Sequence, residues 1–371
     1  MIGRIPNTSW LCVVLLCIVS CKGREEPAEN APPPKKTEVP LRRAGASEAR
    51  TIRFPTDRSM GTVRVRDWGT TSSKAWKDLH DAYGPVAIPA GVEVLLKIGP
   101  MGWQDLSPLS ALQPDDLQAL DLSKTDVTDT GVTPIAHLAG LKILVLRQTK
   151  VGDAGLAQLA GLAALRHLHL ARTRITDAGL AYLKGMKSLE ALDLRRTRIT
   201  DSGLAHLGEL KSLHTLWLSY TKITGPGLAD LKGLTSLRTL DLAGSRITVE
   251  AYLNLQAMAW LESLELNHTR TADSDLARLK GLTNLRTLTL SSTRITSAGL
   301  TSLEGMKSLE TLTLRANKRI GISAVPQLMR MTSLRVLDLR GTKIPTPAVE
   351  ELKKALPKCW IPILQVGART K

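Results

Sequence analysis

A 24-residue repeat dominates this sequence. Leucine opens each successive unit, at Leu117, Leu141, Leu165, Leu189, Leu213, Leu237, Leu261, Leu285, Leu309 and Leu334. The last step is 25 residues long, because one residue is inserted around positions 317 to 319. One unit of this length cannot bury an apolar side by itself. The repeat therefore predicts a solenoid, in which each unit buries its apolar side against its neighbours.

Within a unit, the apolar positions predict one strand followed by one helix. In the third unit, Leu168 and Leu170 stand two residues apart, so both point to one face of a short strand. Leu180, Leu183 and Met186 then recur every three residues, which indicates an inward-facing helical stripe. Thr176 is the predicted helix cap. Stacked units of this kind predict an α/β fold with a parallel sheet inside a curve and helices outside it.

The pattern Leu-x-x-Leu-x-Leu, with Thr at position nine and Thr-Asp-Ala-Gly-Leu opening the second half, resembles the bacterial leucine-rich repeat family. The resemblance covers residues 117 to about 360. It implies a leucine-rich-repeat horseshoe with a parallel β-sheet on the concave face and helices on the convex face. It also implies that the ninth-position hydroxyls, such as Thr173 and Thr197, hydrogen-bond the backbone at the turn.

Composition and motifs divide the chain into five segments. We expect a signal peptide at 1–20, a Pro-rich and charged tether at 21–50, and an N-terminal cap or small α+β module at 51–116. Ten repeats follow at 117–356, and a C-terminal cap and tail at 357–371. In the N-terminal module, residues 73 to 83 are expected to be helical, and Trp68, Trp76 and Trp103 are expected to belong to its core.

The first segment resembles a bacterial lipoprotein signal. A short apolar stretch, residues 11 to 19, leads into Ile18-Val19-Ser20-Cys21. This resemblance to a lipobox implies that Cys21 is acylated. The protein is then a membrane-anchored lipoprotein of the cell envelope, on the periplasmic or outer-surface side. The alternative is an ordinary cleaved signal in which Cys21 is incidental.

The sequence contains no recognisable catalytic motif. It lacks a phosphate-binding loop, a dinucleotide glycine fingerprint, a His-Glu-x-x-His zinc motif and a nucleophile elbow. His167 and His169 are candidate metal ligands, but Asp193 is the only nearby third ligand. Cys359 is expected to be a buried thiol of the C-terminal cap. We therefore predict a protein that is not an enzyme and has no metal, cofactor or small-molecule substrate.

Positions three, five, seven and eight of each unit are expected to face the concavity, and they vary most between units. Units two to five combine an exposed Trp with Tyr, His and several Arg, which is typical of interaction hot spots. The predicted partner-binding residues are Arg147, His169, Arg172, Arg195, Arg196, Trp217 and Tyr220. The alternative is a solvated concave face without a ligand. Carboxylates at position five, such as Asp193, Asp241 and Glu265, are expected to moderate the positive field.

Position ten is basic in nearly every unit, which predicts a basic rim along one edge of the horseshoe. Its members are Lys150, Arg174, Arg198, Lys222, Arg246, Arg270 and Arg294. The chain carries 50 Lys and Arg against 34 Asp and Glu, a formal charge of +16. Such a stripe suggests binding to nucleic acid, but an exported protein rarely encounters nucleic acid. A solvated basic face without a ligand is the alternative.

Together these features predict a non-catalytic, lipid-anchored protein-interaction scaffold of the cell envelope. It would bind a protein or an acidic glycan on its concave face, and it would contact the membrane through the lipid only. The alternative function is a repeat module of a ubiquitin-ligase-like or other enzyme-associated effector that presents substrates.

Overall fold

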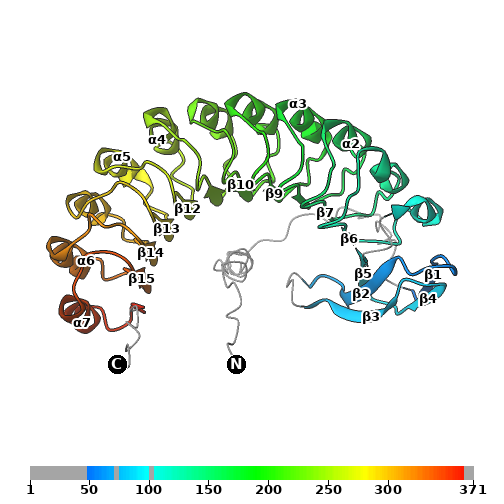
Figure 1. Cartoon of the computed structure of the whole chain (residues 1–371), viewed down its shortest axis with the longest axis horizontal. Helices are drawn as coiled ribbons and strands as arrows, with labels where there is room; N and C mark the ends of the chain where they lie inside the picture. Colours follow the sequence, from blue (N-terminus) through cyan, green and yellow to red (C-terminus); the bar gives the residue numbers. More distant parts are fainter. Residues whose placement is uncertain (1–47, 71–74, 100–103, 363–371) are drawn as a thin grey trace, which may run out of the picture.

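The computed structural model describes residues 48–70, 75–99 and 104–362. These residues form a horseshoe in which short strands line the inner curve and helices line the outer curve (Figure 1). The horseshoe expected from the repeats is therefore confirmed. The predicted signal peptide, the acylation site Cys21 and nearly all of the tether lie outside the described residues.

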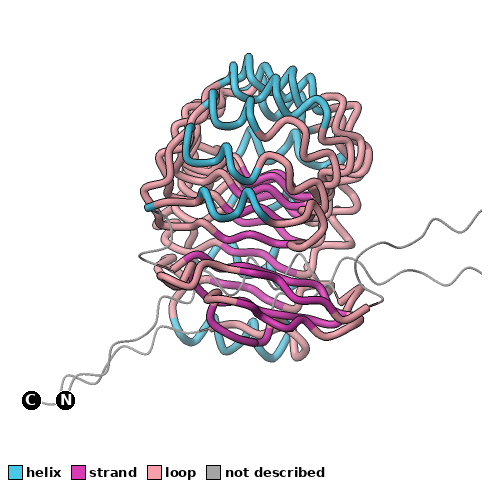
Figure 2. The backbone as a smooth tube through the Cα atoms, turned by 90° about the vertical axis from the view of Figure 1, so that its right-hand side faces the viewer, coloured by secondary structure: helices cyan, strands magenta, loops and turns pink. Residues whose placement is uncertain are grey.

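A single sheet of 13 strands follows the inner curve in the order β15 to β5 and then β2 and β3 (Figures 1 and 2). One three-residue strand comes from positions three to five of each repeat. These strands are β6 (Ala119–Asp121), β7 (Ile143–Val145), β8 (His167–His169), β9 (Ala191–Asp193), β10 (Thr215–Trp217), β11 (Thr239–Asp241), β12 (Ser263–Glu265), β13 (Thr287–Thr289), β14 (Thr311–Thr313) and β15 (Val336–Asp338). Neighbouring strands from β6 to β15 are parallel and pair residues from the same repeat position, as Leu192 and Leu216 do.

The parallel register begins one strand before the first predicted repeat. Strand β5 (Val92–Ile98) pairs with β6 in parallel, with Leu96 opposite Leu120. The antiparallel strand β2 (Gly61–Asp67) then covers the other edge of β5, and β3 (Lys77–Asp81) covers β2. The expected helix around Lys77–Asp81 is thus wrong. This segment is a polar edge strand, a common way to end a sheet. A separate two-stranded sheet joins β1 (Arg50–Arg53) to β4 (Pro85–Ile88).

The outer curve consists of very short helices. The α-helices are α2 (Asp153–Gln158), α3 (Asp177–Leu180), α4 (Val249–Leu255), α5 (Asp273–Arg278), α6 (Val325–Arg330) and α7 (Thr346–Ala355). The 3-10 helices are η3 (Ser107–Ala111), η4 (Thr130–Ile135), η5 (Ala181–Gly185), η6 (Asp201–Leu207), η7 (Pro226–Leu231), η8 (Leu279–Gly281), η9 (Ala298–Leu303) and η10 (Ile322–Ala324). Apolar residues spaced strictly by three, as in Leu180, Leu183 and Met186, match the three residues per turn of a 3-10 helix.

The core runs continuously through the stack between sheet and helices. In the third repeat, Leu165, Leu168 and Leu170 of the strand side are fully buried, as are Leu180 and Leu183 of the helical side. The same positions are fully buried in most repeats. This aliphatic packing explains how the fold is built with 3% aromatic residues.

After each strand the chain turns sharply, and two backbone features fix the turn. Position eight has a positive φ in all ten repeats, including non-glycine residues such as Arg172 (59°) and Tyr220 (57°). Its N–H donates to the next repeat, as from Arg172 to the Arg195 carbonyl at 2.8 Å. The ninth-position hydroxyl donates to the carbonyl three residues earlier, as from Thr173 to Leu170 at 2.6 Å. The predicted structural role of the ninth-position row is therefore confirmed.

Aspartates at position thirteen join adjacent repeats along the outer curve. In the contact of Asp177, Oδ1 accepts the Thr200 backbone N–H at 2.8 Å and Oδ2 accepts its hydroxyl. Asp153, Asp201 and Asp273 contact the next repeat in the same way. Thr176 is the N-cap residue of α3, as predicted, but its hydroxyl makes no capping hydrogen bond and donates to Asp153 of the preceding repeat instead.

The aspartate row explains the glycine at position fifteen of the following repeat. A Cβ on Gly203 would overlap the Asp177 carboxylate, lying 3.0 Å from its Cγ. Each aspartate of this row is followed by such a glycine, at Gly155, Gly179, Gly203, Gly227 and Gly299. Where position thirteen is Gly225, Val249 or Ser297, the next repeat has Ala251, Asp275 or Ala324 instead. Aspartate and glycine therefore form one coupled contact between repeats.

Charged and aromatic side chains close the N-terminal junction. Glu93 of β5 is 4% exposed and accepts from Arg66 at 2.6 Å and from Lys142 at 2.8 Å. Arg66 lies 4.3 Å from the Trp76 ring centroid, and Lys142 lies 3.9 Å from that of Trp68. Trp76 is buried and Trp68 half-buried, so both cover the junction. Trp103 lies outside the described residues.

At the C-terminal end, the helix α7 and one further β-bridge close the stack. Trp360 pairs with Val336 of β15 and donates to the Arg335 carbonyl at 2.7 Å. Cys359 is buried, and burial raises the pKa of its thiol. Among the described residues, no helix has the length and apolarity needed to span a bilayer.

Candidate interaction surface on the concave face

The fifth-position side chains form one row across the middle of the concave face. His169 of β8 pairs with Asp193 of β9, and Asp193 pairs with Trp217 of β10. Asp241 of β11 and Glu265 of β12 continue the row. Because the strands pair in register, residues one repeat apart in sequence lie about 4.8 Å apart across the sheet.

Trp217 lies in this row but is buried, so the expectation of an exposed indole was wrong. It is 6% exposed. The His169 ring stacks on it with centroids 6.1 Å apart, and the Arg195 guanidinium lies 5.6 Å from its centroid. Neighbouring side chains cover the indole because the strands are so close. Trp217 therefore forms the floor of the surface, and among the described residues its N–H has no hydrogen-bond partner.

Asp193 is the electrostatic centre of this part of the row. It is 1% exposed and accepts from Arg195 Nε at 2.8 Å and from Arg195 Nη2 at 2.6 Å. His169 Nδ1 lies 3.7 Å from its Oδ2. Burial acts to raise the pKa of Asp193, but the hydrogen bonds and charges of Arg195 and His169 outweigh it and hold the pKa well below its usual range. The carboxylate therefore stays ionised and fixes Arg195 over the indole.

Tyr220 is the exposed aromatic side chain of the surface. It is 43% exposed, and Arg196 lies 4.1 Å from its ring centroid. On the other side, a Cβ at Gly244 would come within 2.5 Å of Tyr220 Cδ1, so the ring packs against the glycine backbone. This sandwich of Arg196, Tyr220 and Gly244 runs along position eight of three repeats. The glycine was missed in the sequence, although it breaks a row of larger residues.

Two further arginines, Arg147 and Arg172, belong to this surface. Burial lowers the pKa of Arg147, and the positive charges of Arg195 and Arg172 act in the same direction. Arg172 is exposed and Arg147 half-buried. The described structure thus gathers the seven predicted partner-binding residues on β7 to β10 and the turns that follow. Their role in binding stays a prediction.

The next two strands carry carboxyl groups of a different character. Asp241 is 4% exposed and accepts the Ala243 N–H at 2.9 Å. Burial raises the pKa of Asp241. Burial and the neighbouring Asp241 raise the pKa of Glu265 to about 8. The pair therefore holds a proton at neutral pH, so these two carboxyl groups offset the positive charge less than the sequence analysis assumed.

Comparison with known families agrees with this architecture. The Leucine rich repeat family model matches residues 163–223, 259–318 and 283–344, and a second model of that description matches residues 116–136. The fold is that of a leucine-rich-repeat solenoid. No curated protein matches it.

Similar solved structures include three from two bacteria. An internalin from Listeria monocytogenes is 22% identical with a TM-score of 0.48, and the match covers 73% of this chain and 85% of that one. An internalin C2 from the same organism is 26% identical with a TM-score of 0.46 and coverages of 54% and 82%. A leucine-rich-repeat protein from Leptospira interrogans is 18% identical, with a TM-score of 0.36 and coverages of 72% and 89%.

The basic rim lies beyond the strand ends of the leucine-rich repeats. All seven predicted members are exposed: Lys150, Arg174, Arg198, Lys222, Arg246, Arg270 and Arg294. Within the described ranges, only Lys150 makes an ion pair, at 3.1 Å from Asp126. A function for this rim stays a prediction.

A second charged row, missed in the sequence analysis, lies at position two, before each strand. Here three acidic residues each pair with an arginine of the neighbouring repeat. The pairs are Arg166 with Glu190 (3.0 Å), Arg238 with Glu262 (3.4 Å) and Arg286 with Glu310 (2.6 Å). The signal was present in the sequence as an arginine followed by a glutamate 24 residues later.

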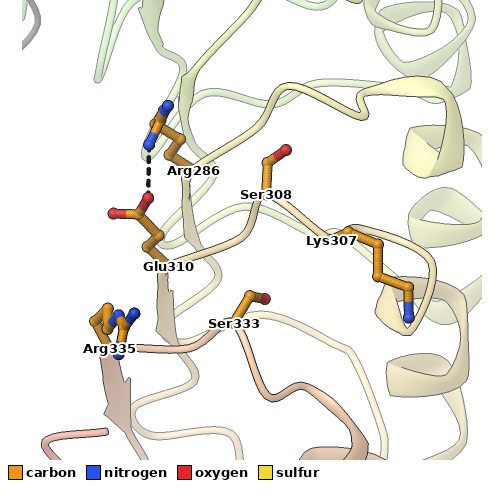
Figure 3. A pocket seen from close by; sticks show the side chains of 6 residues that line it. All are labelled: Arg286, Lys307, Ser308, Glu310, Ser333 and Arg335. Atoms are coloured by element: carbon orange, nitrogen blue, oxygen red, sulfur yellow. Dashed lines mark hydrogen bonds and ion pairs between the residues drawn. The ribbon is translucent and has the colours of Figure 1, made fainter. Parts of the chain in front are cut away.

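A hollow of about 240 Å³ lies beside this row at the C-terminal repeats (Figure 3). It is lined by Arg286, Lys307, Ser308, Glu310, Ser333 and Arg335. The ion pair between Arg286 and Glu310 crosses one side of it. Its volume is below the roughly 300–1,000 Å³ of small-molecule sites, and its lining offers no apolar wall.

His167 and His169, the two histidines considered as metal ligands, have different surroundings. Burial and the charges of His169, Arg66 and Arg166 lower the pKa of His167. His169 contacts Asp193 and the indole of Trp217. Across the described part of the chain, no three His, Cys, Asp or Glu side chains are arranged to hold a metal ion.

Proposed function

We propose that this leucine-rich-repeat protein is a non-catalytic scaffold that binds an acidic protein partner through the concave surface of β7 to β10. The observation that carries this proposal is the sandwich around Tyr220. An aromatic ring that is 43% exposed lies between Arg196 and Gly244, next to a group of arginines. Tyrosine supplies contact area at little entropic cost, and arginine supplies planar donors for carboxylates.

The floor beneath this surface supports recognition by a fixed geometry. Asp193 holds Arg195 through two hydrogen bonds, and Arg195 in turn lies over Trp217. A guanidinium that is already oriented loses less entropy when it binds a carboxylate than a free side chain does. We therefore expect the surface to bind without rearrangement of its strands.

The proposal includes display of the scaffold at the cell envelope through an acylated Cys21. Its support is the resemblance of residues 18–21 to a lipobox. Two acyl chains give stable anchoring, since each buried CH₂ contributes about 0.8 kcal/mol. Labelling with a radioactive fatty acid tests it. The label should enter the native protein and be absent from Cys21→Ser, and a Cys21→Ser protein that keeps the label would contradict anchoring.

The partner site is tested with three versions of residues 51–371 as bait in envelope extracts. Tyr220→Ala removes the concave ring. Tyr182→Ala, in η5 on the outer curve, is the matched control because its ring is 42% exposed. A genuine partner should bind the native bait and Tyr182→Ala equally, and bind Tyr220→Ala at least 30-fold more weakly, corresponding to about 2 kcal/mol. Equal capture by all three baits would contradict the concave site.

A further inference from the structure

The basic rim is a ladder of cations held at repeat spacing by the backbone. Position-ten N–H groups donate to a carbonyl of the preceding repeat, as from Lys150 to Val127 (2.9 Å), Arg174 to Val151 (2.9 Å), Arg198 to Ile175 (3.1 Å), Lys222 to Ile199 (2.9 Å) and Arg294 to Thr271 (2.9 Å). Hydrogen-bonded neighbours of this kind lie about 4.8 Å apart. Each repeat from the second to the eighth therefore adds one cation to a regular row.

Neighbouring cations in this row repel one another. The backbones that carry them lie about 4.8 Å apart, which is shorter than the screening length of about 8 Å at physiological salt. Apart from Lys150 with Asp126, no described acidic group forms an ion pair with any of the seven. A ligand that brings regularly spaced negative charges would relieve this repulsion and release the condensed counterions.

The position-two row shows that the fold does not require such a row. It lies at the opposite ends of the same strands, and there acidic residues pair with arginines of the neighbouring repeat, as in Arg166 with Glu190 and Arg286 with Glu310. Two rows with the same repeat spacing thus differ in one respect, the presence of acidic partners. Repeat geometry alone cannot explain why the rim lacks them.

We propose that the basic rim binds a linear acidic polysaccharide laid along the curve of the solenoid, with its carboxylates beside successive repeats. A regular row of equivalent cations fits a polymer with equivalent anions better than the irregular surface of a folded protein. Single-stranded nucleic acid requires aromatic side chains on which bases stack. In the seven repeats of the rim, position eight offers only two aromatic rings for this, Tyr220 and His268, and Gly244 separates them. The proposal is independent of the concave partner site.

The probe is a fluorescent oligogalacturonate, titrated into the purified full chain in non-ionic detergent at pH 7 and several salt concentrations. The rim variant combines Arg198→Gln, Lys222→Gln and Arg246→Gln. The matched control combines Arg166→Gln, Arg238→Gln and Arg286→Gln from the position-two row, which removes the same charge. We expect the rim variant to bind at least tenfold more weakly and with a smaller salt dependence, and the control to change less than twofold.

Three results would overturn the proposal. One is equal weakening in the two triple variants, because binding would then follow net charge alone. Another is tighter binding of single-stranded DNA than of the oligogalacturonate, and the third is no binding of the probe at physiological salt. The variant Tyr220→Ala separates this site from the concave one, since it should leave oligogalacturonate binding unchanged. Circular dichroism of each variant establishes that it is folded.

Discussion

The coupled contact between aspartate and glycine predicts a specific loss of stability in the variant Gly299→Ala. In the native chain, Asp273 accepts the Thr296 N–H at 2.8 Å and its hydroxyl at 2.6 Å. A Cβ on Gly299 would overlap Asp273 Oδ1 and lie 2.7 Å from its Cγ, so the carboxylate must move. Hydrogen bonds to charged groups contribute about 1.5–3 kcal/mol each. Alanine is better than glycine in a helix by about 0.5–1 kcal/mol. The net cost should be about 2–4 kcal/mol.

A control variant and a double variant test this prediction. Gly305→Ala, in the same repeat, should be nearly neutral because nothing lies within 4 Å of the added Cβ. Asp273→Ala should itself destabilise, but adding Gly299→Ala to it should cost nothing further. Urea unfolding followed by circular dichroism measures all four proteins. Because repeats need not unfold together, hydrogen exchange of residues 296–304 measures the contact locally. The reasoning fails if Gly299→Ala behaves like Gly305→Ala, or if its cost is unchanged in the Asp273→Ala background.

Three further predictions concern the core and the concave face. The folded protein keeps Glu265 protonated up to about pH 8, whereas the unfolded chain ionises near 4.5. The free energy of unfolding should therefore fall as pH rises from 4.5 to 8. Glu265→Gln should raise it by about 1–2 kcal/mol more at pH 8 than at pH 4.5, which is less than the roughly 5 kcal/mol of the full pKa shift because the side chain is half-buried. Urea titrations at the two pH values test this, and a stabilisation that does not change with pH would contradict it. Tyr252 is 1% exposed, and its hydroxyl lies 2.6 Å from that of Thr271. Tyr252→Phe should therefore cost about 1–3 kcal/mol of stability, and adding Thr271→Val should restore most of it. Thermal melting measures both variants, and additive losses would contradict the prediction. Leu192→Ala should cost about 2–5 kcal/mol and Arg198→Ala less than about 0.5 kcal/mol in the same melts; equal shifts would mean that the inward and outward positions are misassigned.

The repeat itself carries most of the information about the fold. Leucines with a fixed period must lie on the inside of the stack, and the structure buries them fully, as at Leu168 and Leu192. The same period was present but unnoticed one unit earlier, because Leu96 pairs with Leu120 of the first repeat in that register. The aspartate row and its glycines were also visible, because each aspartate precedes a glycine in the next unit. Their coupling could not be inferred before the Cβ contacts were known.

What the sequence predicted poorly depends on how side chains cover one another. Alternation along a strand shows that Trp217 faces the concavity, but it cannot show that His169 and Arg195 from neighbouring strands cover it. Exposure at the inside of a curve depends on the size of all adjacent residues. The helix type could not be predicted from the apolar spacing. A spacing of three occurs in both α and 3-10 helices, and short segments between tightly stacked repeats favour the tighter form.

Pairing of charges, rather than charge itself, distinguishes the surfaces of this solenoid. Position five is buried or half-buried, whereas position ten is exposed. At position two three glutamates pair with arginines of neighbouring repeats, and at position five Asp193 neutralises Arg195 while Asp241 and Glu265 together hold a proton. At position ten the cations form no ion pair beyond that of Lys150 in the part of the chain described. A net charge of +16 cannot separate these cases. A row that the chain leaves unpaired, although it pairs the arginines Arg166, Arg238 and Arg286 of position two, is therefore the stronger sign of an external anion.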